Sequence, residues 1–154
     1  MGLVLPSCRN LIQITEPEID SFLDSQKILN VATIGPRGWP HVVAMCYGFY
    51  DHRIAFWTYR KSQKVLNLRR DDRMTVLVES GDNYSELKGI EIEGRGTLIE
   101  DPAKVLTVGR SIFARYRDQL ADSSIDAFTA SAPKRLVVIV EPENIVSWDH
   151  SKLS

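Results

Sequence analysis

Three strand-like segments lie close together between residues 28 and 59, and the connections between them are short. Ile28 to Ile34 is apolar and partly β-branched, and the turn-forming residues 35–38 separate it from a second segment, Pro40 to Tyr50. Only residues 51–52 separate that segment from a third, Arg53 to Tyr59. Connections this short join antiparallel neighbours, because parallel strands need a crossover of a dozen or more residues. The sequence therefore predicts an antiparallel meander.

The rest of the chain adds further strands and several helices. We expect strands over 74–79, 86–100, 136–140 and 144–148, and helices over 15–26, 62–71, 102–118 and 123–131. Gly89, Gly94 and Gly96 interrupt the long strand, as bulges or barrel corners require. The prediction is a mainly β, α+β fold: a closed or partly closed antiparallel barrel with flanking helices, in a single domain over 1–154. Residues 1–14 are expected to form a loose or partner-bound arm.

The composition argues against several classes of function. The 154 residues carry a formal net charge of −1, which does not suggest a nucleic-acid or anionic-membrane partner. No apolar run approaches the roughly 20 residues that cross a bilayer. Cys8 and Cys46 do not make a disulfide framework and are interpreted as free thiols. The three histidines are not at metal-ligand spacing, so no metal site is expected. We expect a cytoplasmic protein.

The segment that follows the third strand is strongly basic. Residues 60 to 73 include six basic side chains, opposed only by Asp71 and Asp72. Arg60, Lys61 and Lys64 fall at the predicted start of a helix, where the macrodipole already disfavours cations by a few tenths of a kcal/mol (~0.3) each. A phosphate would find free backbone N–H groups, the Ser62 hydroxyl and these cations together. We interpret the turn as a phosphate site; the alternative is a solvated basic face beside a simple Ser62 cap.

The second strand has one face without bulky side chains. Its two faces are formed by His41, Val43, Met45, Tyr47 and Phe49 on one side, and by Val42, Ala44, Cys46 and Gly48 on the other. A flat ring of isoalloxazine type could lie close to the backbone on the small face. The alternative is a tightly packed barrel interior, in which small residues offset large ones.

These segments, in their order, resemble a known superfamily. Residues 30–45, the run Phe56-Trp-Thr-Tyr-Arg-Lys-Ser-Gln-Lys-Val-Leu-Asn-Leu-Arg-Arg70, and residues 93–96 are similar to the pyridoxamine-5'-phosphate-oxidase-like FMN-binding split barrels. Within that superfamily the chain looks closest to the actinobacterial flavin/deazaflavin oxidoreductases. The resemblance covers roughly residues 15 to 148. It implies a six-stranded split β-barrel that forms a homodimer, with two cofactor sites at the subunit interface.

The resemblance also implies roles for individual residues. Thr58, Arg60, Lys61, Ser62 and Lys64 would hold the cofactor phosphate, while Val42, Val43, Ala44 and Met45 would line the ring through the main chain. Asn67 would support the turn or contact a longer cofactor tail. Which of Arg60 and Lys61 points inward is left open, and no residue of pyridoxamine phosphate recognition is apparent.

The expected function is that of an oxidoreductase that passes a hydride from FMN or the deazaflavin coenzyme F-420 to a small organic molecule. Arg69, Arg70 and Arg73 exceed what one phosphate needs, which favours F-420 with its anionic tail. No catalytic acid or base stands out, although Tyr47 is one candidate proton donor. Two alternatives remain: a carrier of flavin, deazaflavin or haem without turnover, and a plain dimeric barrel with a vestigial site.

Overall fold

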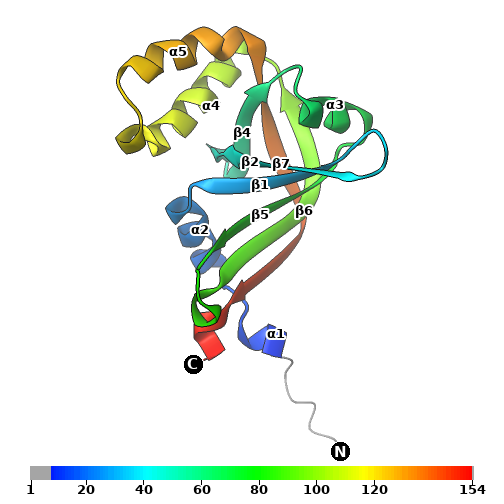
Figure 1. The fold of residues 1–154 in the computed structure, drawn as a ribbon, viewed down its shortest axis with the longest axis vertical. Coiled ribbons are helices and arrows are strands. Elements are labelled where there is room, and N and C mark those ends of the chain that lie inside the picture. Colours follow the sequence, from blue (N-terminus) through cyan, green and yellow to red (C-terminus); the bar gives the residue numbers. More distant parts are fainter. Residues whose placement is uncertain (1–7, 154) are drawn as a thin grey trace, which may run out of the picture.

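A single curled antiparallel sheet dominates the computed structural model, which describes residues 8–153. Its strands are β1 (Ile28–Ile34), β2 (Pro40–Cys46), β3 (Gly48–Tyr50), β4 (Arg53–Tyr59), β5 (Arg73–Ser80), β6 (Lys88–Ile99) and β7 (Arg135–Asp149). They lie in the order β2-β1-β5-β6-β7-β4-β3, and every neighbouring pair is antiparallel. Figure 1 shows β1 and β2 crossing over the long strands β5, β6 and β7.

The sheet closes on itself through one residue. β2 and β3 are at opposite ends of the strand order, yet only Tyr47 separates them in the chain. Before Tyr47, Cys46 pairs with Ile28 of β1; after it, Gly48 pairs with Ala55 of β4. Residues 40–50 are thus one strand that changes partner, and counted this way the sheet has the six strands of a split barrel. The predicted mainly β fold with flanking helices is confirmed.

The helices cover the open parts of this barrel. They are α1 (Cys8–Leu11), α2 (Glu16–Ser25), α3 (Gln63–Arg70), α4 (Pro102–Arg115) and α5 (Ser123–Ser131), with short 3-10 turns at Tyr84–Glu86, Arg117–Gln119, Ala132–Lys134 and His150–Leu153. α2 begins as its capping sequence predicts, because the Thr15 N–H donates to Glu18 Oε2 at 2.7 Å. α4 packs on β3 and β4, and α3 packs on β1 (Figure 1).

Two clusters of buried side chains hold these layers together. The larger fills the barrel and includes Leu29, Val31 and Phe56, none of which is exposed. The smaller lies between α4 and the outer sides of β4 and β7, around Trp57 and Ile112. The two clusters are on opposite faces of the same strands, as the alternation of side chains in a β-strand requires.

Three details differ from the sequence-based expectation. The two predicted closing strands, 136–140 and 144–148, form the single strand β7, and the predicted helix 102–118 ends at Arg115. Residues 1–7 of the predicted arm lie outside the described residues. The remainder of the arm is not loose, because Cys8–Leu11 is helical, Ile14 is buried and the Ile12 carbonyl accepts from the Asp149 N–H at 2.7 Å.

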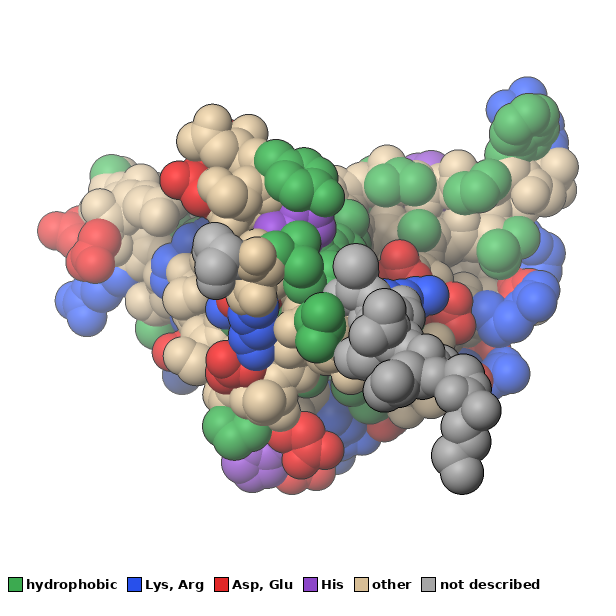
Figure 2. All heavy atoms as spheres, turned by 90° about the horizontal axis from the view of Figure 1, so that it is seen from below, with side chains coloured by type: hydrophobic (Ala, Val, Ile, Leu, Met, Phe, Trp, Pro, Cys, Tyr) green, Lys and Arg blue, Asp and Glu red, His purple; other side chains and the backbone are tan. Residues whose placement is uncertain are grey.

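The surface carries charges of both signs. Figure 2 shows Lys and Arg side chains next to Asp and Glu side chains on the face seen from below, together with hydrophobic ones. Charges of both signs are therefore mixed on this face. None of the helices in residues 8–153 is both long enough and apolar enough to cross a membrane.

Candidate functional site

The end of β4 and the start of α3 bring three of the predicted phosphate residues together. Thr58 is buried near the end of β4, and its Oγ1 lies 3.3 Å from the Oγ of Ser62, the residue before α3. The Ser62 side chain does not cap the helix. The first backbone N–H groups of α3 have no intrahelical acceptor, as at any helix start, so they are available to an anion.

Lys64 lies in the middle of this group and is nearly buried. Only 8% of the residue is exposed, and its Nζ donates to Thr58 Oγ1 at 3.0 Å. No carboxylate in residues 8–153 lies within ion-pair distance of this ammonium group. Burial, and secondarily the charge of Arg135, lower the pKa of Lys64. A buried cation without a counter-ion is costly, and an anionic ligand would remove that cost.

Arg135 is a second cation whose charge acts on Lys64 and which sequence reasoning missed, although its guanidinium stacks on the face of β4 opposite the Thr58 side chain. It begins β7 and pairs with Tyr59, and its guanidinium carbon lies 4.0 Å from the centre of the Tyr59 ring and 4.5 Å from that of Trp57. The Ser131 Oγ accepts from its Nε at 3.0 Å. This position depends on the register between β4 and β7, which nothing in the sequence near residue 60 indicates.

Asn67 fastens the helix to the sheet. It is completely buried; its Nδ2 donates to Thr33 Oγ1 at 3.0 Å, and its Oδ1 accepts from Gln63 Nε2 at 2.8 Å. Because Thr33 belongs to β1, the bond to Thr33 holds α3 against the barrel. Of the two roles considered for Asn67, supporting the turn is the one that these contacts favour.

Arg60 and Lys61 are not drawn into the group around Lys64. Arg60 turns toward Glu100: its NH1 lies 3.4 Å from Glu100 Oε1, and its Nε donates to the Arg135 carbonyl at 3.1 Å. Lys61 is exposed. In this structure neither Arg60 nor Lys61 points into the group around Lys64.

The three arginines that favoured a long anionic tail are engaged within the chain. Arg69 pairs with Glu100 at 2.7 Å and Arg73 with Asp71 at 2.7 Å, while Arg70 donates to the Ile34 carbonyl. Their hydrogen bonds reduce the free positive charge that an extended groove would offer, so they do not by themselves favour F-420 over FMN.

The predicted ring-binding segment is at an edge of the sheet. β2 pairs only with β1, so one side of the main chain of residues 42–45 has no strand neighbour. Val42 and Ala44 point outward and are exposed, while Val43 and Met45 pack against the core. The small face is therefore not a packed barrel interior, except at Gly48, which Ile112 of α4 covers.

His41 joins the two halves of the candidate site. It pairs with Thr33, the residue that holds Asn67, and it precedes the ring-binding segment on β2. The Nδ1 atom of His41 is buried and has no hydrogen-bond partner in the described structure. Orphaned buried atoms of this kind are rare in folded proteins, and a bound ligand would satisfy it. The sequence did not mark His41, because its surroundings depend on the strand register.

Tyr47 cannot serve as the proton donor considered from the sequence. Its side chain is completely buried, its hydroxyl donates to the Leu23 carbonyl, and burial raises its pKa to about 12. The backbone N–H of Tyr47 donates to the Tyr116 hydroxyl at 3.0 Å. Tyr47 therefore fixes the point where the strand changes partner. In residues 8–153, no group of three His, Cys, Asp or Glu side chains could hold a metal ion.

Comparison with known proteins places the chain in a family. The family described as pyridoxamine 5'-phosphate oxidase matches residues 15–149. A conserved hypothetical protein of Mycobacterium tuberculosis has 39% identity and a TM-score of 0.86, and the match covers 94% of this chain and 91% of that one. No curated protein matches the sequence.

More distant structures share the fold alone. An F420 reductase has 23% identity and a TM-score of 0.66, and the match covers 82% of this chain and 94% of that one. The heme storage protein HutZ of Vibrio cholerae has 16% identity and a TM-score of 0.70, and the match covers 90% of this chain and 99% of that one. With most of its length matched by the family pattern, the chain belongs to the pyridoxamine 5'-phosphate oxidase family.

Proposed function

We propose that this protein binds FMN or coenzyme F-420 through the cofactor's phosphate group and uses it to transfer a hydride to a small organic molecule. The observation that carries the proposal is Lys64, a nearly buried ammonium group that has no carboxylate within ion-pair distance in residues 8–153. A phosphate beside this ammonium group would be bound by charge-assisted hydrogen bonds, which are among the strongest in proteins.

Each part of the site has a distinct role in this proposal. Lys64, Thr58, Ser62 and the first N–H groups of α3 bind the phosphate, and Asn67 keeps the helix in position for them. The unpaired edge of β2 offers main-chain groups to the ring. The cofactor supplies the hydride chemistry, and the protein supplies orientation and shielding from water.

The same proposal includes a homodimer with the cofactor at its interface. The outer side of β1 and β2 is apolar and open: Ile28 is 51% exposed and Val42 62% exposed, and Cys46 lies opposite Ile28 in the sheet. An exposed apolar sheet face is typical of an interface between protein chains. A second copy placed there would also cover the ring-binding segment of β2.

A carrier without turnover is the second candidate. It is favoured by the engagement of Tyr47, the proton donor considered from the sequence, whose hydroxyl donates to the Leu23 carbonyl. The fold is shared with a protein described as a heme storage protein. Reduction kinetics separate the two candidates: a bound cofactor that exchanges no electrons with any tested acceptor would favour the carrier.

Fluorescence titration with FMN and with F-420 tests the cofactor site. We expect one of them to bind, and Lys64→Ala to weaken binding at least about tenfold, because a charged hydrogen bond contributes roughly 1.5–3 kcal/mol. Arg60→Ala should change affinity much less, since Arg60 pairs with Glu100, and Lys61→Ala is the matched control at an exposed lysine. Binding of neither cofactor, or equal loss in all three variants, would contradict the proposal.

A further inference from the structure

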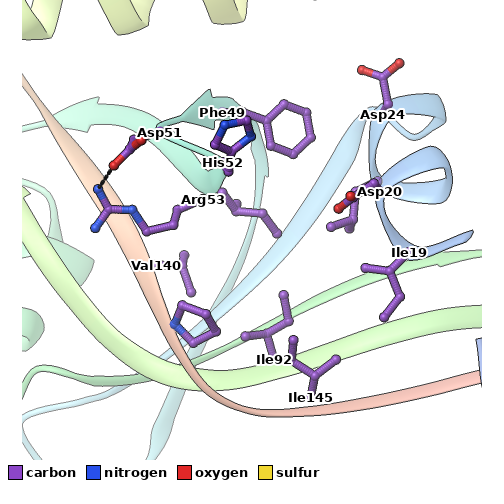
Figure 3. A pocket seen from close by; sticks show the side chains of 13 residues that line it. Ile19, Asp20, Asp24, Phe49, Asp51, His52, Arg53, Ile92, Val140 and Ile145 are labelled. Atoms are coloured by element: carbon purple, nitrogen blue, oxygen red, sulfur yellow. Dashed lines mark hydrogen bonds and ion pairs between the residues drawn. The ribbon is translucent and has the colours of Figure 1, made fainter. Parts of the chain in front are cut away.

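A separate hollow opens at the other end of β4. It has a volume of about 610 Å³ and lies between α2, the turn that joins β3 to β4, and the middle of β7 (Figure 3). Volumes of this size are typical of small-molecule sites. β4 runs from Arg53 at the hollow to Tyr59 beside the phosphate residues, six steps of about 3.3 Å each, so the two places are roughly 20 Å apart along the strand.

The floor of the hollow is apolar. Ile54, Ile92 and Val140 contribute side chains that are at most 6% exposed, and each comes from a different strand. Ile145, which is 47% exposed, extends this apolar surface to the rim. Figure 3 shows Ile92 and Ile145 together on one side of the space and Phe49 across from them. An apolar body of several carbon atoms would bury this floor.

The rim of the hollow is acidic and incompletely neutralised. Asp20 and Asp24 of α2 lie on one side and Asp51 on the other (Figure 3). The lining includes one arginine, Arg53, whose NH1 already pairs with Glu141 and whose NH2 lies 3.3 Å from Asp51.

The two carboxylates on α2 are the less neutralised part of this rim. The Asp20 carboxylate has no ion pair or hydrogen bond within residues 8–153, and the Asp24 carboxylate has a single ion pair there, at 3.4 Å from Arg115 NH1. The guanidinium of Arg115 is committed mainly to main-chain carbonyls at the end of α2, with the Gln26 carbonyl at 2.7 Å. Like charges four residues apart on a helix destabilise it slightly, and a cation between them would reverse that effect.

From the apolar floor and the acidic rim together, we propose that this hollow binds an organic cation with an apolar body. Its ammonium group lies against Asp20 and Asp24, and its hydrocarbon part covers Ile54, Ile92 and Val140. The proposal does not depend on the cofactor site, because the negative rim repels phosphates and the hollow lies at the opposite end of β4.

Three probes with the same carbon skeleton test the proposal: 4-phenylbutylamine, 4-phenylbutanol and 4-phenylbutyrate. Isothermal titration calorimetry of the full-length protein should show that the amine binds at least tenfold more tightly than the alcohol and that the carboxylate binds most weakly. Added FMN or inorganic phosphate should not displace the amine. Equal affinity for amine and alcohol, or displacement by phosphate, would overturn the proposal.

A matched pair of double variants locates the binding. Asp20→Asn with Asp24→Asn should reduce the preference for the amine at least fivefold. Asp122→Asn with Asp126→Asn changes two carboxylates at the same spacing, one at the N-cap of α5 and one within that helix, which do not line the hollow, and should leave the preference unchanged. All four aspartates are exposed, so both variants should fold, and circular dichroism checks this. A preference retained in the Asp20/Asp24 variant, or amine binding only by dissociated monomers, would refute the proposal.

Discussion

Lys64 illustrates the conflict between binding and stability at the scale of one residue. Its ammonium group is removed from water, and within residues 8–153 it has only the Thr58 hydroxyl as a hydrogen-bond partner, while the charge of Arg135 adds repulsion. Without an anion the folded protein bears this cost, and the unfolded chain does not. The residue that would bind the phosphate therefore weakens the cofactor-free fold.

Replacing this cation should stabilise the cofactor-free protein. We expect Lys64→Met to raise the free energy of unfolding by about 1 kcal/mol, or the melting temperature by roughly 2–4 °C, because an apolar chain of similar length replaces a buried charge. Thermal unfolding followed by circular dichroism measures the change. Lys61→Met, at an exposed position, should leave the melting temperature unchanged, and a lower melting temperature for Lys64→Met would show that the ammonium group is already compensated.

The extra stability of the Lys64→Met variant should decrease as the pH rises. The pKa of folded Lys64 is below its ordinary value of 10.5, so between the two values the unfolded chain holds the proton while the folded protein does not. The stability of the wild type therefore rises with pH through that window, and the advantage of Lys64→Met shrinks. Urea unfolding of both proteins at about pH 7 and about pH 10 tests this; an advantage that is constant or grows would contradict it.

Residues that act through local chain geometry could be predicted, and residues brought in by strand register could not. Thr58, Ser62 and Lys64 fall within seven positions, so the strand-to-helix polarity alone brought them together in the prediction. Arg135 is 71 residues beyond Lys64, and it reaches the site only because β7 pairs with β4. The ion pair of Arg60 with Glu100 could not be predicted either, because Glu100 is 40 residues further along the chain.

At the scale of elements, the pairing of β6 with β7 is shaped by one irregularity. Glu93 pairs with Asn144 and Gly94 pairs with Pro142, so Glu143 is an extra residue on β7. A proline can occupy this position because a bulge interrupts the ladder of hydrogen bonds. The sequence predicted a bend at Gly94, but the residues around Pro142 were interpreted as a break between two strands. The bulge instead lets one strand continue through them.

Gly94 should be difficult to replace. A Cβ added there would lie 2.0 Å from the Glu141 carbonyl oxygen and 2.9 Å from its carbon, and main-chain atoms cannot rotate away. We expect Gly94→Ala to lower the free energy of unfolding by roughly 2–4 kcal/mol, measured by chemical denaturation. Glu93→Ala, at the exposed neighbouring position, is the control and should cost less than about 1 kcal/mol. Equal effects would mean that the bulge can relax.

At the scale of the whole molecule, the open face of β1 and β2 determines the expected assembly. Ile28, Val42 and Cys46 expose apolar surface on the outer side of the sheet, and Ala32 lies opposite Val42. α4 covers β3 and β4, whereas within residues 8–153 no helix packs as extensively on β1 and β2. A second copy is the partner that the proposed function assigns to it.

A charge at the centre of this face should separate the copies. We expect Val42→Arg to convert a dimer into a monomer and to lower cofactor affinity at the same time, because β2 would lose the cover of the second copy. Light scattering after size exclusion measures the mass, and fluorescence titration measures the affinity. Leu120→Arg changes an exposed leucine in another part of the chain and should alter neither. A wild-type protein that is monomeric at all concentrations would disprove this assembly.

The partner change at Tyr47 has a consequence for how the chain can fold as it is synthesised. β3 and β4 are made early, yet β4 needs β7, the last strand to be made, as its other neighbour. One edge of β6 likewise has no neighbouring strand until β7 is made. The sheet therefore cannot be completed until residues 135–149 have left the ribosome, and until then two strand edges stay open to other chains. A chain that stalls near residue 130 should accordingly be held by chaperones or degraded, although it already contains every predicted phosphate residue.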